Sequence, residues 1–256
     1  MSGVRRYLPA AAVFVLVLAL WEAVVGVFSI EDFLLPPPST IGRTFFAELG
    51  VIVPAGIFTL REALGGFLIG TAGGAVVAIA TSRWRPVRDR LLPVTIAVNS
   101  TPIITLAPIT NNWFSITNPL SKMTVVAVLV FFPVMINMVR GLREVEPSAL
   151  ELMRSYAATE RTVLFRLRIQ NALPFLFSAL KVGASLAVIG AIVSEYFGGS
   201  RDALGVYIQQ QAALFHFAEA WAAIIVASSM GIGLYALILT AERLLMPWHV
   251  SLRRGE

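Results

Sequence analysis

Six arginines stand in a polar segment, residues 140–174, that separates two long apolar runs. They are Arg140, Arg143, Arg154, Arg161, Arg166 and Arg168. Guanidinium groups are always charged and carry five N–H donors, so a cluster of them recognises anionic groups. The pattern predicts either a docking surface for a partner protein or interfacial helices whose arginines reach anionic lipid headgroups.

Other kinds of chemistry lack the residues they need. The sequence has no cysteine and two histidines, which argues against disulfides and against a cysteine-based or histidine-rich metal site. Lys122 and Lys181 follow Ser121 and Leu180, so neither completes a Gly-Lys-Ser/Thr phosphate loop. No pair of intramembrane carboxylates faces a histidine, as a proton relay would require. We therefore expect no catalytic residue and no cofactor in this chain.

The composition predicts the elements that position the arginines. The chain is 57% hydrophobic and 14% charged, with a mean hydropathy of +0.78. Several apolar runs are long enough to cross about 30 Å of hydrocarbon, which predicts an all-α membrane protein with one transmembrane domain over residues 1–256. Six spans are expected, at about 8–28, 56–81, 91–111, 123–138, 175–197 and 218–240.

The basic residues predict the orientation of these spans. Fifteen of the 20 lysines and arginines fall at the two termini, in residues 83–90 and in residues 140–174, all on one side of the six-span topology. Loops rich in lysine and arginine stay in the cytoplasm. Both termini and the arginine-rich segment are therefore predicted to be cytoplasmic, and the net charge of +5 reflects topology rather than nucleic-acid binding.

Capping signals predict two short helices within residues 140–174. Pro147 suits the first turn of a helix from about 148 to 157, because the N–H that proline lacks would be unpaired there. Thr159 is a candidate cap for a second helix from Glu160 to Ile169. This second helix is expected to end before Asn171, and Pro174 to begin the next span.

Polar and small residues within the spans suggest contacts and a pathway. Gly66, Gly70 and Gly74 repeat every four residues, which predicts close helix packing. Side chains that could line a solute pathway are Asn99, Thr101, Thr105, Ser185 and Glu195. Interhelical hydrogen bonding explains the first three equally well, and Glu195 is expected in a gate or an interhelical contact. Lys181 is expected to reach the inner surface.

The segment ELMRSYAATERTVLFRLRIQ, residues 151–170, resembles the cytoplasmic signature of bacterial ABC importer permeases, E-A-A-x3-G-x9-I-x-L-P. Glu151 falls on the glutamate, Ala157 on the glycine and Gln170 on the proline of that pattern. LLPPPSTI, TLREALGGF, LAPITNNWFSITNPLSK, FFPVMINMVRGL and SEYFGGSRDALGVYI are similar to the nitrate, sulfonate and taurine class of these permeases. The resemblance covers most of the chain.

The resemblance implies a permease subunit in the bacterial inner membrane. It implies three protein partners: a separate ATP-binding subunit that holds ATP and Mg²⁺, an extracytoplasmic solute-binding protein, and a second permease subunit that is either identical or different. The residues implied to couple to the ATP-binding subunit are Glu151, Arg154, Tyr156, Ala157, Ala158, Thr159 and Arg161.

Two departures from the family pattern affect the expected loop geometry. Alanine is less suited than glycine to the left-handed conformation, so the joint at Ala157 is expected to be a continuous bend. Gln170 keeps an N–H that proline would lack, which would let the second helix extend toward Leu173. Both changes would suit one half of a heterodimeric permease.

The solute is not specified by these residues. The resemblance implies a small anion such as a sulfonate or nitrate, or a pyrimidine or flavin-like vitamin precursor, with a lean to the latter because NNWFSITNPLSK departs from the sulfonate-type segment. An alternative function is an ATPase-independent membrane facilitator or a membrane anchor for a complex.

Overall fold

The computed structural model describes residues 2–83 and 102–247, and all regular structure in these ranges is helical. The elements are α1 (Ser2–Val27), α2 (Pro38–Ala47), α3 (Leu49–Arg83), η1 (Ile103–Leu106), α5 (Ala107–Phe114), α6 (Pro119–Arg143), α7 (Pro147–Ser155), α8 (Glu160–Val163), η2 (Leu164–Arg168), α9 (Ile169–Tyr196), α10 (Leu204–Ala213) and α11 (Phe217–Leu245). Of these, η1 is a 3₁₀-helix and η2 is one turn of π-helix.

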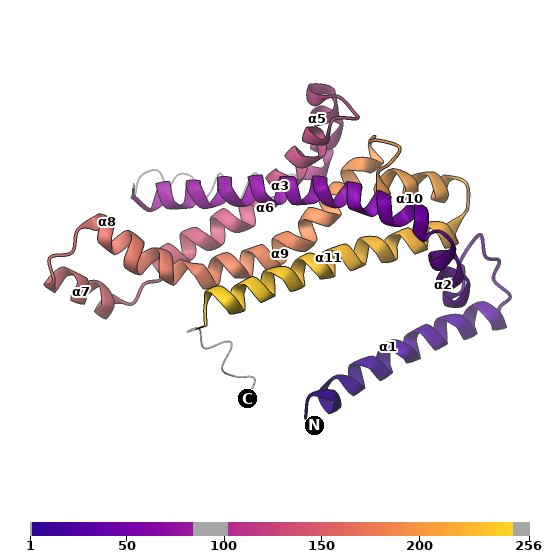
Figure 1. Ribbon diagram of the computed structural model, residues 1–256, viewed down its shortest axis with the longest axis horizontal. Coiled ribbons are helices and arrows are strands. Elements are labelled where there is room, and N and C mark those ends of the chain that lie inside the picture. Colours follow the sequence, from indigo (N-terminus) through magenta and orange to yellow (C-terminus); the bar gives the residue numbers. More distant parts are fainter. Residues whose placement is uncertain (1, 84–101, 248–256) are drawn as a thin grey trace.

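Four long helices, α3, α6, α9 and α11, lie side by side as an elongated bundle (Figure 1). Five helical segments in the described ranges are long and apolar enough to cross a membrane. They are Leu8–Val27, Leu49–Thr81, Pro119–Arg143, Glu160–Tyr196 and Phe217–Leu245. The chain is thus an all-helical membrane protein, as its composition predicts.

The predicted third span, 91–111, falls largely on residues outside the described ranges. Its last part departs from one straight helix, because Pro102 is non-helical, with φ −68° and ψ 86°, and is followed by η1 and then α5. The short helix α5 rises away from the long axis of the bundle (Figure 1). The count of six spans therefore remains a prediction.

Small residues let α3 and α6 approach closely. A β-carbon at position 66 would lie 2.6 Å from the Met123 carbonyl oxygen, and one at position 74 would lie 2.7 Å from the Phe131 carbonyl oxygen. A β-carbon does not approach a carbonyl oxygen this closely in real structures, so larger residues would push the helices apart. This contact confirms the packing role predicted for the glycine repeat of the second span.

The helix α1 stands apart from the bundle, and 6% of its most apolar window is buried (Figure 1). It is tied at one end only, where Ser39 donates to Glu22 from its N–H at 3.0 Å and from its hydroxyl at 2.6 Å. The rings of Trp21 and Trp221 also meet edge to face, 5.3 Å between centroids. Nearly all of its apolar surface is therefore available to lipid.

Candidate functional site

The segment between α6 and α9 projects beyond one end of the bundle as α7 and α8 (Figure 1). Helix α7 begins with Pro147 in its first turn, as the sequence predicts, and no residue of Pro147–Ser155 is buried. A helix whose two faces are both accessible derives little stability from packing. It is consequently a surface that a partner can cover.

A sharp left-handed turn separates α7 from α8. Ala157 has φ +51°, the Ala157 N–H donates to the Arg154 carbonyl at 2.9 Å, and the Ala158 N–H donates to the Met153 carbonyl at 3.0 Å. These two hydrogen bonds satisfy carbonyls that the end of a helix otherwise leaves unpaired. The expectation of a continuous bend at Ala157 is therefore wrong, because the capping hydrogen bonds hold alanine in the conformation that glycine favours.

The second short helix begins as predicted but does not end where predicted. The Thr159 hydroxyl caps it by accepting from the Thr162 N–H at 3.3 Å. The helix then continues through the π-turn, where the Ile169 N–H donates to the Leu164 carbonyl, and runs on through Pro174 to Tyr196. The expected stop before Asn171 is wrong, and the alternative extension of the helix toward Leu173 is confirmed.

The helix that contains α8, η2 and α9 is too long for the membrane alone. Its 37 residues, Glu160–Tyr196, correspond to about 55 Å, whereas the hydrocarbon core is about 30 Å thick. About three turns after its start it is held to the end of α6, because the Asn171 amide donates to the carbonyls of Gly141 at 2.8 Å and Glu144 at 3.0 Å. The joint at Ala157 is thus connected to a membrane span by one uninterrupted helix.

The residues predicted to couple to a partner gather around this joint. Glu151, Arg154, Tyr156, Ala157, Thr159 and Arg161 are exposed, and Ala158 is half-buried. Tyr156 is 77% exposed, and the Arg161 guanidinium lies 6.0 Å from the centroid of the exposed Phe165 ring. Exposed aromatic and arginine side chains are the types that dominate protein interfaces.

A buried polar cluster lies at the opposite end of the bundle, around Glu195. The Glu195 carboxylate accepts from the Thr59 hydroxyl at 2.8 Å and from the Gly205 N–H at 2.6 Å. The Thr59 hydroxyl in turn accepts from the Leu204 N–H at 2.9 Å. Glu195 and Thr59 thereby hold the first two N–H groups of α10 against α3 and α9, which confirms the interhelical contact expected for Glu195.

Glu62 and Lys122 belong to the same cluster, and neither was identified as a site residue from the sequence. Glu62 is 3% exposed and lies close enough to Glu195 for their carboxyl groups to interact. Lys122 is 1% exposed and donates to the Asn111 side-chain oxygen at 2.9 Å and to the Ile116 carbonyl. A charged residue inside or beside a predicted span was the available signal.

The other predicted pathway residues do not join this cluster. The Thr105 side chain is exposed and its hydroxyl donates to the Pro102 carbonyl at 2.7 Å. Ser185 is exposed on α9. Asn99 and Thr101 lie outside the described residues. The structure therefore does not bring Thr105, Ser185 and Glu195 to one place within this chain.

Lys181 has a partner within the bundle rather than at its surface. Its ammonium group contacts both carboxylate oxygens of Glu242 on α11, at 2.8 and 3.1 Å. The Lys181 side chain is 22% exposed and the Glu242 side chain 9%. Sequence reasoning missed this ion pair, because α11 supplies a carboxylate that the sequence of α9 does not reveal. That Lys181 reaches the inner surface stays a prediction.

The described residues thus form a bundle of candidate membrane spans with a capped helical joint at one end and a buried polar cluster at the other. In the part of the chain that is described, no three His, Cys, Asp or Glu residues gather as a metal site. The chain belongs to the family of binding-protein-dependent transport system inner membrane components, whose family model matches residues 70–248.

Individual relatives agree with this family. The chain is 30% identical over 238 residues to the riboflavin transport system permease protein RibX of Chloroflexus aurantiacus, covering 92% of this chain and 88% of RibX. It is 31% identical over 241 residues to the formylaminopyrimidine transport permease protein ThiX of Halalkalibacterium halodurans, covering 92% and 93%. The sequence resemblance to ABC importer permeases is thereby confirmed, and the chain is a permease subunit of the inner membrane.

A solved structure shares the fold. The crystal structure of an amino acid ABC transporter with histidines matches with a TM-score of 0.61 at 17% identity, covering 77% of this chain and 95% of that chain. At this identity the match supports the helical arrangement alone.

Proposed function

We propose that this permease subunit crosses the membrane six times, keeps both termini in the cytoplasm, and docks a separate ATP-binding subunit through α7 and α8. The distribution of lysine and arginine supports this orientation, because it places residues 140–174 on the cytoplasmic side. The observation that carries the proposal is the exposed, capped joint at Ala157, surrounded by accessible charged and aromatic side chains. ATP and Mg²⁺ would be held by the partner, and this chain would hold no cofactor.

The geometry suggests how a partner could move the spans. An energy source biases two conformations only through a contact whose free energy differs between them. A force applied to α7 and the Ala157 joint would pass into α9 along one continuous helix, and into α6 through the Asn171 side chain. Coupling of this kind requires no flexible linker between the docking surface and the membrane.

The remaining partners are proposed from the family. An extracytoplasmic solute-binding protein would deliver solute at the end opposite α7, and a second permease subunit, either identical or different, would complete the pathway. The lipid bilayer would cover the apolar surface of the spans that no protein partner covers, and no nucleic acid is expected as a partner. We keep Asn99, Thr101, Thr105 and Ser185 as pathway residues, and assign Glu195 to holding the outer wall of that pathway.

The names of the relatives favour one class among the candidate solutes. RibX and ThiX are named as permeases for riboflavin and for formylaminopyrimidine. We propose a vitamin or pyrimidine precursor as the solute of this chain, with a sulfonate-like or nitrate-like anion as the alternative.

Reconstitution tests this function against the alternative of a facilitator or a membrane anchor. Proteoliposomes would contain the chain with its ATP-binding subunit and binding protein, and uptake of labelled riboflavin, formylaminopyrimidine and taurine would be measured. The proposal expects uptake that requires ATP and is lost when Glu151 is substituted or when residues 155–161 are deleted. Uptake by the chain alone without ATP would overturn it.

A further inference from the structure

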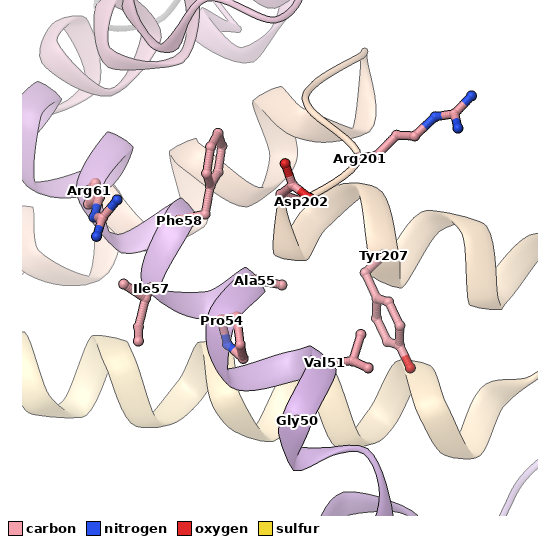
Figure 2. Close-up of a pocket in the computed structure, with 10 residues that line it drawn as sticks. All are labelled: Gly50, Val51, Pro54, Ala55, Ile57, Phe58, Arg61, Arg201, Asp202 and Tyr207. Carbon is pink, nitrogen blue, oxygen red and sulfur yellow. The ribbon is translucent and has the colours of Figure 1, made fainter.

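A pocket of about 650 Å³ (Figure 2) opens beside α10 and the first half of α3, at the end of the bundle that lies opposite α7 in Figure 1. One wall is the first half of α3, with Val51, Pro54 and Phe58, and the other is α10 with the loop before it. This volume lies in the range of small-molecule sites, which are mainly apolar with a few polar groups.

Two arginines line this pocket. Arg61 extends from α3, and Arg201 lies at the rim with its guanidinium directed away from α3 (Figure 2). Among the described residues, neither arginine has an ion-pair partner, whereas Lys181 and Arg140 do. Asp202 faces the pocket from the opposite wall and accepts from the Ser200 hydroxyl at 3.2 Å. The pocket therefore carries a net formal charge of about +1 above an apolar floor.

Tyr207 closes the pocket on the α10 side. Burial, together with the carboxylates of Glu48 and Glu219, raises the pKa of Tyr207 to about 12, so its hydroxyl stays protonated at neutral pH. That hydroxyl donates to Glu48 at 3.4 Å. Tyr207 thus contributes its ring to the pocket and adds no charge.

The buried cluster holds the two walls at a fixed separation. Thr59 lies on α3 between Phe58 and Arg61, and its hydroxyl accepts from Leu204, two residues after Asp202. Glu195 holds the next N–H, that of Gly205. When the walls of a site are already ordered before the ligand binds, binding costs less conformational entropy and the affinity is higher.

We propose that this pocket binds an organic oxyanion, a carboxylate, sulfonate or phosphate group held by Arg61 and attached to an apolar body that rests on Pro54 and Phe58. Arg201 attracts the anion at the rim. The ligand is either a free solute or the headgroup of an anionic lipid. This inference rests on the proposed function in one respect only: the proposed orientation puts the pocket on the extracytoplasmic side of the membrane.

The absence of cysteine from the sequence allows a local test. Val51→Cys, at a position that is 50% exposed, is placed in phosphatidylcholine nanodiscs and reacted with an anionic methanethiosulfonate and with its cationic analogue of similar size. Rates are normalised to those of Phe46→Cys, outside the pocket on α2. Arg61→Gln should slow the anionic reagent about fivefold and Arg201→Gln about twofold, and Arg61→Lys should restore most of the rate.

Occupancy is tested with pentane-1-sulfonate, and pentan-1-ol serves as the matched neutral control. The sulfonate should protect Val51→Cys from both reagents, the alcohol should not, and Arg61→Gln should abolish the protection. Arg43→Gln, an exposed arginine on α2, should leave it intact. If phosphatidylglycerol in the nanodisc protects the cysteine before any sulfonate is added, the anion is a lipid headgroup. If only the soluble sulfonate protects, it is a free solute.

Either source supports the proposal. Equal protection by sulfonate and alcohol, or reaction rates that do not respond to Arg61→Gln, would overturn it. This outcome is separable from the proposed function, because pocket labelling needs neither ATP nor uptake. Protection without ATP-driven uptake would contradict the importer assignment alone, and ATP-driven uptake without protection would contradict the pocket alone.

Discussion

The joint at Ala157 and the cluster around Glu195 are both held by hydrogen bonds, but the bonds connect different kinds of neighbours. At the joint, donor and acceptor are at most five residues apart, as in Ala158 to Met153, and the side chains are exposed. In the cluster, Thr59 and Glu195 are 136 residues apart and both are buried. The joint is encoded locally and its surface is left for a partner, whereas the cluster depends on the whole bundle and stabilises it.

The largest loss of stability is expected when Glu195, the central residue of the cluster, is replaced. Glu195→Ala leaves the Thr59 hydroxyl and the Gly205 N–H without their acceptor and removes the carboxylate beside Lys122. Breaking a buried charged network typically lowers the free energy of unfolding by about 3 to 5 kcal/mol. Unfolding in dodecyl maltoside titrated with sodium dodecyl sulfate would measure the loss.

The variant should still bind the ATP-binding subunit under mild conditions, because α7 lies at the other end of the bundle. Unchanged stability would contradict the central role assigned to Glu195.

A smaller loss is expected from Thr59→Val. The hydroxyl of Thr59 both donates to Glu195 and accepts from Leu204, so valine leaves one buried N–H unpaired. We expect the free energy of unfolding to fall by about 1 to 3 kcal/mol in the same titration. Thr240→Val is the matched control, since that hydroxyl is exposed and bonds only to the Ala236 carbonyl within its own helix. Equal losses in the two variants would argue against the long-range network.

At the joint, the expected change has the opposite sign. Ala157→Gly removes the left-handed strain of about 1 kcal/mol or more, although the greater backbone freedom of glycine offsets part of it. The Ala158 N–H, which donates to Met153, should exchange with deuterium about two- to fivefold more slowly as the turn becomes more stable. Faster exchange in the glycine variant would show that the turn is not held in the left-handed conformation.

The smallest effect is expected for the exposed ion pair at the end of α6. Arg140 and Glu144 are 2.7 Å apart, with side chains 65% and 49% exposed. Pairs of this kind contribute about 0.5 kcal/mol or less, so Glu144→Ala should leave the unfolding midpoint nearly unchanged. A loss as large as that of Thr59→Val would place this pair among the structural contacts.

The same contrast explains which features could be predicted from the sequence. Pro147 and Thr159 act on backbone groups a few residues away, and both were predicted correctly as helix starts. The lengths of the apolar runs correctly predicted long helices in the part of the chain that the structure describes. Residues 160–196 were predicted as two helices, 160–169 and about 175–197, separated before Pro174, whereas α8, η2 and α9 run on through Pro174 as one helix.

Features that depend on distant partners were missed. The ion pair of Lys181 was missed because α9 alone offers this side chain no carboxylate within reach, whereas α11 supplies Glu242. The position of Glu62 and Lys122 in or beside a predicted span was visible in the sequence, but their common cluster with Glu195 depends on the packing of α3, α6 and α9. At Ala157 the preference of a single residue was outweighed by two capping hydrogen bonds.

Co-purification of the ATP-binding subunit with two matched variants tests the central claim most directly. Tyr156, at the joint, is 77% exposed, and Phe46, on α2 near the opposite end, is 73% exposed, so neither truncation should unfold the chain. We expect Tyr156→Ala to reduce the co-purified subunit at least tenfold, an effect of about 1.4 kcal/mol or more on docking, and Phe46→Ala to leave it unchanged. Full retention with Tyr156→Ala, or an equal loss with Phe46→Ala, would contradict the assignment of α7 and α8 as the coupling surface.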